Sequence, residues 1–250
     1  MGFLSGLFGK KKVNHEPVPN PYLVDMHSHL LPGIDDGSES FDESVEMIKR
    51  LAETGYRKFI TTPHVMSDFY KNSPETILPV CEKLNAVLKE QNIDIRVEAA
   101  AEYNIDDNLE KQLADDKLLS FGGDKKYILV ETSYLSNAPN FDEVIFNLKI
   151  AGYQPILAHP ERYTYMYDDF EKYRTLFGKG VCFQINLASL AGYYSKEAKK
   201  IAEKLIQEKM VNFVGTDIHH TRHLSALLHA QQSPGFAALT KLDILNNTLL

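Results

Sequence analysis

The 250-residue sequence has only two cysteines, Cys81 and Cys182. They lie far apart in the chain and lack the paired spacing of a disulfide framework. Disulfides persist in oxidising compartments and are rare in the cytosol, where thiols are kept reduced. The sequence is therefore typical of a cytoplasmic protein, and we interpret both cysteines as small apolar residues of the core.

The sequence also lacks any apolar run of the ~20 residues that span a bilayer. Its first segment, MGFLSGLFGKKK, places the basic residues after the apolar ones, which is the reverse of a secretion signal. Gly6 stands where a myristoylation signal has serine or threonine. We expect a flexible leader and no stable membrane insertion, with contact at the inner face of the membrane as the alternative.

An excess of basic residues is absent as well. Lysine and arginine number 27 against 34 aspartates and glutamates, which gives a formal net charge of -7. Sequence-independent binding to nucleic acid depends on clustered lysines and arginines that displace counterions. The charge balance therefore argues against a nucleic-acid partner.

The remaining composition is that of an ordinary globular protein. Apolar residues make up 44% of the chain and charged residues 24%, which is enough apolar surface for a sizeable core. Barrels of this length commonly form one domain. Pro17, Pro19 and Pro21 mark a stiff linker. We therefore expect a flexible leader and Pro-rich linker over residues 1–21 and a single domain over residues 22–250.

Short β-rich runs alternate with longer stretches of helical period. Seven strands are expected, at 22–26, 57–62, 94–101, 127–131, 154–158, 181–186 and 211–216. Helices are expected at 40–54, 73–91, 140–151, 168–178, 195–208 and 223–231, with a polar, helical connection between 103 and 121. This alternation is typical of a parallel α/β fold, either an open doubly wound sheet or a closed barrel.

Side chains of the kind that bind metals follow or end six of the expected strands: His27, His64, Glu102, Glu131, His159 and Asp217. In a barrel the carboxyl ends of all strands meet at one face, where active sites assemble. The placement favours the barrel, because these side chains would then converge. A single His-x-His motif is more often incidental than metal-binding, so the prediction of a site depends on the accumulation.

The candidate set is completed by His29, Asp35, Asp36 and His219. It combines imidazoles with carboxylates and contains no cysteine, which suits Mn, Fe or Zn in a catalytic site. A carboxylate such as Glu102 can bridge two cations, which would activate a shared water for an in-line phosphoryl displacement. Arg162 and Arg222 each stand three residues beyond a candidate histidine. They are candidates for binding phosphate oxygens, with exposed salt bridges as the alternative.

Six segments resemble the polymerase-and-histidinol-phosphatase (PHP) superfamily, and within it the manganese-dependent protein-tyrosine phosphatases of bacterial capsule loci. They are VDMHSHLLPGIDDGS at 24–38, TTPH at 61–64, AAEYNID at 100–106, ILVET at 128–132, LAHPERY at 157–163 and VGTDIHH at 214–220. The resemblance extends from residue 22 to about residue 235. It implies an α/β fold, a distorted seven-stranded (β/α)7 TIM-like barrel known as the PHP fold, with a trinuclear metal centre at its carboxyl face.

The resemblance also implies roles for individual residues. The metal ligands would be His27, His29, Glu102 and Asp217 for the first ion, Glu102, Glu131 and His159 for the second, and Asp36, His64 and His219 for the third. Asp36 fits the pattern better than Asp35 because it directly precedes the glycine. Arg162 matches the family's phosphate-contacting arginine, whereas Arg222 lies closer to His219 than the family's second arginine does. Two or three divalent ions are expected, manganese first, with iron or zinc as alternatives.

The activity implied by the resemblance is hydrolysis of protein phosphotyrosine by a hydroxide that bridges two metal ions. The partner would be the tail of a tyrosine autokinase of capsule or exopolysaccharide synthesis. A thiol-based mechanism is excluded, because Val87 and Ala188 stand where an arginine would follow each cysteine by six positions. A histidinol-phosphatase-like or other small-molecule phosphoesterase is the enzymatic alternative, and an inactive metal-binding scaffold is the other. The sequence is compatible with a homo-oligomer.

Aromatic and imidazole side chains suggest two further features of this site. Several tyrosines fall in loops after the expected strands, where they could line a cleft for an aromatic ring: Tyr70, Tyr163, Tyr165, Tyr167, Tyr193 and Tyr194. A general acid for the leaving phenolate is not identified by its position. His220, His223 and Tyr163 are the candidates.

Overall fold

The computed structural model describes residues 20–250, so most of the expected leader and linker lies outside the described residues. Two sheets, with every strand pair parallel, form the centre of the fold. One sheet has the order β1 (Val24–Asp25), β2 (Lys58–Thr61), β4 (Arg96–Ala99). The other has the order β3 (His64–Val65), β5 (Glu102–Asn104), β6 (Tyr127–Glu131), β7 (Gln154–Ala158), β8 (Cys182–Asn186), β9 (Phe213–Gly215).

The described part of the chain has nine strands rather than the seven expected, because the short strands β3 and β5 lie just beyond the expected ranges 57–62 and 94–101. Pro63, which has no backbone N–H, separates β2 from β3. Ala100 and Ala101 separate β4 from β5. Backbone hydrogen bonds continue across both gaps: Ala100 N–H donates to Thr61 O at 2.8 Å, and Glu102 N–H donates to Pro63 O at 3.0 Å. The two sheets therefore follow one another along the same pair of chain segments.

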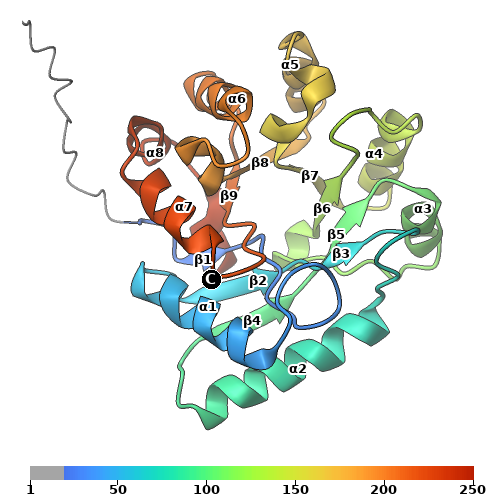
Figure 1. Cartoon of the computed structure of the whole chain (residues 1–250). Coiled ribbons are helices and arrows are strands. Elements are labelled where there is room, and N and C mark those ends of the chain that lie inside the picture. The colour runs from blue at the N-terminus through green and yellow to red at the C-terminus, as the bar shows by residue number, and fades with distance from the viewer. Residues whose placement is uncertain (1–19) are drawn as a thin grey trace, which may run out of the picture.

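The first and last strands lie side by side at their carboxyl ends. Asp217 N–H donates to His27 O at 2.8 Å, and His29 N–H donates to Ile218 O at 3.0 Å. Ser28 and Ile218 form an isolated parallel bridge between these two segments. Figure 1 shows the strands around a common centre, with the helices on the outside.

Helices occupy all six of the ranges in which they were expected. They are α1 (Phe41–Glu53), α2 (Pro74–Glu90), α4 (Phe141–Ile150), α5 (Glu171–Gly178), α6 (Lys196–Gln207) and α7 (His223–Gln231). The polar connection contains the strand β5 as well as the helix α3 (Asp107–Ala114), and α8 (Pro234–Leu239) was not expected. Among residues 20–250, no helix combines the length and the apolar character that crossing a membrane requires.

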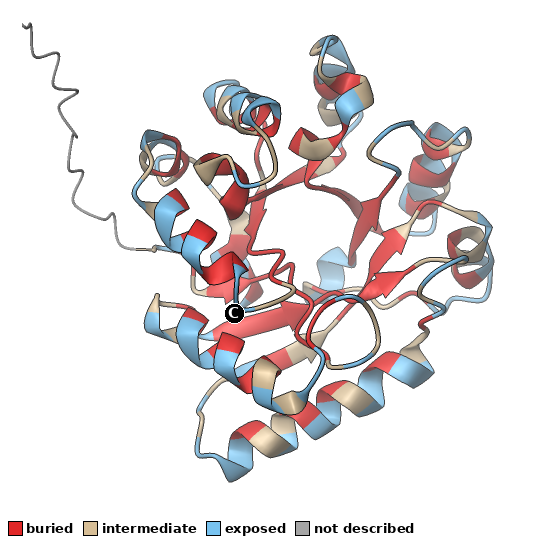
Figure 2. Cartoon of the chain, viewed as in Figure 1, coloured by how far each residue is buried: buried red, intermediate tan, exposed pale blue. Residues whose placement is uncertain are grey.

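Helix α1 illustrates why these segments form helices that cover the sheets. Its first turn is capped as the Ser40–Glu43 spacing predicts, because Glu43 N–H donates to Ser40 Oγ at 3.2 Å. Val45, Ile48 and Leu51 recur at helical spacing and are buried. The helix thus presents one apolar face to the sheet, and the polar residues between these positions face solvent (Figure 2).

Successive strand residues face two separate apolar clusters. On β6, Tyr127 and Leu129 belong to the smaller cluster, while Ile128 and Val130 belong to the larger cluster that includes the buried helix faces. Adjacent side chains of a strand point to opposite faces, so both faces of β6 are buried. Glu131 is the next residue on the same face as Leu129. The alternation therefore places the Glu131 carboxylate at the carboxyl end of β6, on the face that packs in the smaller cluster.

Asn246, near the C-terminus, joins the amino-terminal half of the fold to β9. Its side chain is fully buried, donates to Val24 O at 2.8 Å and Val214 O at 2.7 Å, and accepts from Val214 N–H at 2.9 Å. Replacing it by alanine would leave three buried backbone groups without partners. We expect Asn246→Ala to lower the free energy of unfolding by about 3 kcal/mol, measured by denaturant titration.

The neighbouring Asn247 supplies the control for this experiment. It also bonds to backbone, accepting from Leu23 N–H at 2.7 Å and donating to Pro21 O at 2.9 Å, but in an exposed position. Water replaces such bonds when the side chain is removed, so Asn247→Ala should have a much smaller effect. Equal losses of stability in the two variants would contradict the role assigned to Asn246.

Candidate metal centre

The structure brings all nine predicted metal-ligand residues to the carboxyl ends of the strands. Their donor atoms fall into four overlapping groups, each with atoms within 4.8 Å of one another. The groups are His27, His29 and Asp217; His27, Glu102 and His159; His64, Glu102 and Glu131; and His29, Asp36, His64 and His219. Strand ends far apart in the sequence thus supply one continuous site.

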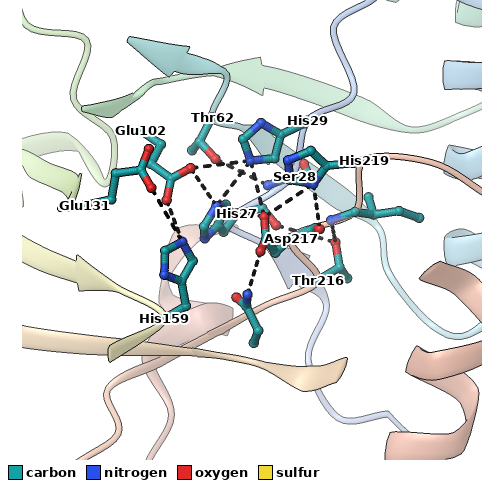
Figure 3. A network of polar contacts seen from close by, with 12 residues as sticks. His27, Ser28, His29, Thr62, Glu102, Glu131, His159, Thr216, Asp217 and His219 are labelled. Atoms are coloured by element: carbon teal, nitrogen blue, oxygen red, sulfur yellow. Dashed lines mark hydrogen bonds and ion pairs between the residues drawn. The ribbon is translucent and has the colours of Figure 1, made fainter. Parts of the chain in front are cut away.

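Glu102, the first residue of β5, lies at the centre of this arrangement. Its Oε2 atom lies 3.3 Å from His27 Nε2, 3.5 Å from His29 Nε2 and 3.1 Å from His64 Nδ1, and its Oε1 atom lies 3.0 Å from His159 Nε2. Figure 3 shows its carboxylate in contact with the histidines on both sides. A fully buried carboxylate with this surrounding is placed to bridge cations.

Asp217 presents its two carboxylate oxygens to different partners. Oδ1 lies 3.4 Å from His27 Nε2 and 3.3 Å from His29 Nε2. Oδ2 accepts hydrogen bonds from Asn186 at 2.6 Å, from Arg162 at 3.0 Å and from the Tyr194 hydroxyl at 3.1 Å. One oxygen therefore faces the histidines, while the other is held by three donors.

Backbone geometry also marks this site. His159 has φ 32° and Asp217 has φ 49°, both in the left-handed region that residues with a Cβ seldom adopt. Such conformations cost free energy and persist only where the surrounding structure imposes them. Each of these residues directly follows a strand or lies two residues beyond one, so the strained backbone turns a side chain into the site.

The outer part of the centre contains Asp36, His64 and His219. Asp36 Oδ1 lies 3.5 Å from His64 Nε2 and 3.6 Å from His219 Nε2, and the Asp36 side chain is 54% exposed. The ring of His219 stacks on that of His29 with 3.9 Å between centroids. This group lies at the solvent side, whereas Glu102 lies at the buried side.

Asp35 belongs to none of the four donor groups, but its carboxylate contacts two of the candidate ligands. Its Oδ2 atom lies 2.8 Å from His29 Nδ1 and accepts from His64 N–H at 3.2 Å. The following glycine is required by space, because a Cβ on Gly37 would lie 2.3 Å from His29 O. In the Asp-Asp-Gly segment, Asp35 therefore orients His29, and the next residue, Asp36, is a candidate metal ligand at the exposed edge of the centre.

Supporting contacts fix the orientation of two imidazoles. His27 Nδ1 lies 2.8 Å from Gln184 Oε1, as His29 Nδ1 does from Asp35. When Nδ1 carries the proton for such a bond, Nε2 keeps its lone pair, and here both Nε2 atoms face the centre. Gln184 lies inside strand β8 and has no motif of its own, so sequence reasoning missed it.

The charges of the site favour cation binding. Burial by itself disfavours ionisation of Glu102, but the neighbouring histidines, His27 and His64 first, hold the pKa of that carboxyl well below its ordinary value. For Asp217, burial likewise raises the pKa, but His27, His29 and Arg162 lower it more. The pKa of this carboxyl is therefore also held well below its ordinary value. Both carboxylates are therefore anionic at neutral pH.

The donor atoms fit divalent cations better than a hydrogen-bonded cluster. Both oxygens of Glu102, Oε1 of Glu131 and Nδ1 of His64 are buried and form no hydrogen bond of suitable geometry, although His64 Nδ1 lies 2.8 Å from Glu131 Oε1 and 3.1 Å from Glu102 Oε2. Buried polar atoms in folded proteins are normally satisfied, so several orphaned donors and acceptors directed at one another indicate a missing common partner. Imidazoles and carboxylates without a thiolate are the ligands that Mn, Fe and Zn share.

A cavity of about 310 Å³ opens above these residues. It is lined by Asp36, His64, Tyr134, His159, Arg162, Tyr194, Asp217, His219, His220 and His223. The Arg162 guanidinium carbon lies 4.3 Å from the ring centroid of Tyr134 and 4.1 Å from that of Tyr194. Stacking on two rings and the bond to Asp217 fix this arginine in the cavity wall. Tyr134 was not among the predicted residues, although its position in the loop after the strand 127–131 is the signal that selected the other tyrosines.

Arg222 does not reach the cavity. It is exposed, directly precedes α7, and is not among the residues that line the space above the metal centre. The spacing of three residues after His219 placed it on the expected face, but the chain turns into a helix there and directs it to solvent. The predicted phosphate-binding role of Arg222 is therefore not supported by its position.

The remaining candidates differ in their surroundings. His220 and His223 line the cavity, and His223 Nδ1 accepts from His219 N–H at 3.2 Å. Burial and the neighbouring histidines lower the pKa of His223 to about 4, so it is neutral at pH 7. Tyr163 is fully buried, and its hydroxyl accepts from Thr132 N–H at 3.3 Å. Tyr163 is thus a structural residue, whereas Tyr194 lines the cavity as expected.

The fold and the site together define a parallel α/β protein with a cluster of histidines and carboxylates, of the kind that binds metal ions, at the carboxyl ends of its strands. A family model described as capsular polysaccharide synthesis, CpsB/CapC, matches residues 23–232. The chain belongs to this family. The membership confirms the predicted resemblance to the capsule-locus branch.

Individual relatives agree with this membership. The chain is 34% identical to the tyrosine-protein phosphatase YwqE of Bacillus subtilis (strain 168) over 201 residues. This alignment covers 80% of this chain and 78% of the relative. It is 27% identical over 204 residues to the tyrosine-protein phosphatase CpsB of Streptococcus pneumoniae, covering 79% of this chain and 83% of the relative.

A solved structure shares the whole fold. It comes from the crystal structures of YwqE from Bacillus subtilis and CpsB from Streptococcus pneumoniae, which are described as metal-dependent tyrosine phosphatases. It superimposes with a TM-score of 0.80 and 31% sequence identity, over 91% of this chain and 94% of that chain.

The central and outer carboxylates should differ in their effect on metal content. Glu102 contacts four histidines, whereas Asp36 contacts two at the exposed rim. We expect Glu102→Gln to lose most of the bound metal and Asp36→Asn to lose at most one ion per chain, measured by elemental analysis after equilibration with Mn²⁺. Asp68→Asn, an exposed acid outside the centre, is the control. Full metal content in Glu102→Gln would contradict the central role of this carboxylate.

Proposed function

We propose that this chain is a metal-dependent protein-tyrosine phosphatase that hydrolyses phosphotyrosine on a bacterial tyrosine kinase of capsule or exopolysaccharide synthesis. The observation that carries the proposal is the position of Arg162, held in the cavity wall directly beside Asp217 of the candidate metal centre. Cations and a fixed guanidinium on one cavity are the groups that bind a phosphoryl group. The names and the metal dependence of the relatives support the same activity.

The proposal assigns the nine residues to three cations as the family resemblance implies. His27, His29, Glu102 and Asp217 would hold one cation; Glu102, Glu131 and His159 a second; Asp36, His64 and His219 a third. These sets overlap with the four donor groups of the structure but do not coincide with them, since His64 groups there with Glu102 and Glu131 as well as with Asp36. We propose manganese as the physiological metal, with iron and zinc as alternatives. When bound, the ions would supply an activated water and neutralise charge on the phosphoryl group.

The protein's own residues prepare the site for this reaction. Asp35 and Gln184 hold two imidazoles with Nε2 toward the centre, so these two rings are already oriented for cation binding. Tyr134 and Tyr194 hold the Arg162 guanidinium between their rings, where its free N–H groups can bind phosphoryl oxygens. The arrangement is therefore preorganised for a tetrahedral dianion next to the metal centre.

The cysteines take no part in the proposed reaction. Burial raises the pKa of the Cys81 thiol and of the Cys182 thiol to about 11, so neither is a thiolate at neutral pH. Neither residue lines the cavity above the metal centre. Their positions in α2 and at the start of β8 fit the interpretation as apolar core residues.

We also propose the wider setting of the enzyme. The described strands are interpreted as a distorted seven-stranded barrel, with residues 22–250 as one catalytic domain, because the interrupted pairs β2–β3 and β4–β5 each continue one path. The protein would act in the cytoplasm, at the inner face of the membrane, on the flexible tail of a tyrosine autokinase. A homo-oligomer is compatible with this setting.

The substrate class can be tested directly. We expect the Mn²⁺-loaded protein to hydrolyse a phosphotyrosine peptide with a kcat/KM at least about tenfold above that for histidinol phosphate, and to lose activity on chelation. A preference for histidinol phosphate would favour the small-molecule phosphoesterase. The absence of turnover on either ester by metal-loaded protein would favour the inactive scaffold.

The two arginines form a matched pair for testing phosphate recognition. Arg162 lies in the cavity wall and Arg222 is exposed outside it. We expect Arg162→Ala to lower kcat/KM for phosphotyrosine by about 10²–10³, the typical cost of removing one donor to a developing anionic centre. Arg222→Ala should stay within about twofold of the parent. Comparable losses in the two variants would contradict the assignment.

A further inference from the structure

A second cavity lies beside the metal centre. It has a volume of about 470 Å³, and we call it the side cavity. Its walls come from the segments that follow three neighbouring strands: 66–69 after β3, 104–106 at the end of β5, and 131–139 from the end of β6. Figure 1 shows β3, β5 and β6 next to one another. No part of the reaction proposed above uses this space.

The side cavity adjoins the cavity at the metal centre. Tyr134 lines both cavities, and Glu131, a candidate metal ligand, lines the side cavity. Tyr134 is also one of the two rings that hold Arg162. A molecule whose phosphoryl group contacts Arg162 therefore has its neighbouring part within reach of the side cavity.

The most exposed large apolar side chains of the described residues lie at this cavity. Phe69, which lines it, is 75% exposed, and Leu135, between two lining residues, is 78% exposed. The other exposed large apolar residues of this part of the chain are less accessible. Covering such side chains is favourable, so two of them beside an active-site cavity indicate a surface that is covered when substrate binds.

Hydrogen bonds hold these walls in place. Met66 and Tyr70 form an antiparallel bridge, with N–H to O distances of 2.8 and 3.0 Å, and Phe69 lies in the tight turn between them. Ser67 N–H donates to Asp106 Oδ2 at 2.9 Å, which joins the first wall to the second. Phe69 is therefore exposed on a constrained backbone rather than on a loose loop, and less entropy is lost when it is covered.

The polar lining narrows the identity of the occupant. The lining residues include serines, asparagines and the acids Asp68, Asp106 and Glu131, but no lysine or arginine. Amide and hydroxyl groups suit the backbone of a polypeptide, whereas the carboxylates disfavour a second phosphate or an acidic segment. The occupant that fits is a peptide segment with an apolar side chain and without acidic residues.

We propose that the side cavity binds the polypeptide next to the phosphotyrosine, with an apolar substrate side chain packed on Phe69 and Leu135. The inference rests on the proposed phosphatase function and adds a specificity site to it. Small phosphate esters would use only the cavity at the metal centre. Protein substrates would use both cavities.

The test compares free phosphotyrosine with two phosphotyrosine peptides, one with leucines and one with aspartates flanking the phosphotyrosine. We expect the Mn²⁺-loaded parent to prefer the leucine peptide over the aspartate peptide. In the double variant Phe69→Ser/Leu135→Ser, kcat/KM for the leucine peptide should fall about tenfold, while kcat/KM for free phosphotyrosine stays within about twofold. Phe146→Ser, which changes a 62% exposed phenylalanine on α4, is the control and should leave both values unchanged.

The outcomes separate the two proposals. If the parent hydrolyses neither free phosphotyrosine nor either peptide, the proposed function fails. If it hydrolyses them, but the double variant keeps its turnover of the leucine peptide, the side cavity is not a substrate site and the inference fails alone. A change in oligomeric mass of the double variant with unchanged peptide turnover would instead assign Phe69 and Leu135 to an interface between copies, and would also overturn the inference.

Discussion

The contact of the buried Glu102 carboxylate with four histidines is the constraint on which the rest of the site depends. A carboxylate removed from water is costly unless positive charge or hydrogen bonds compensate it. Here the compensating groups are imidazoles, which come from the segment after β1, the first residue of β3 and the residue after β7. The strands must therefore meet at one face for this residue to be tolerated.

Asp217 links the histidines of the candidate metal centre to Arg162. Its Oδ1 atom faces the histidines, and its Oδ2 atom accepts from Asn186, Arg162 and Tyr194. A change in charge at the metal centre is therefore felt directly by the arginine that faces the cavity. The left-handed backbone at this residue is consistent with a position whose local cost is offset by these contacts.

The segments around the centre form two features, the candidate metal centre and the side cavity. Candidate ligands come from the segments after β1, β7 and β9 and from β3, β5 and β6, while the segments after β3, β5 and β6 also build the side cavity with its exposed Phe69 and Leu135. Active sites commonly assemble at strand termini in this way, with the chain segments beyond the strands shaping the surrounding surface.

The sequence by itself determined the parallel α/β class and six of the helices, because hydrophobic periodicity is a local signal. Residue type at strand ends pointed to six candidate ligands, and the resemblance to the family completed the set of nine. It did not reveal that Pro63 and the Ala100–Ala101 pair interrupt two strands, or that Arg222 points to solvent. Only the tertiary structure decided that Tyr134 and Tyr194 enclose Arg162 and that Gln184 orients His27. Those contacts join residues far apart in the chain, and no spacing within the sequence encodes such distances.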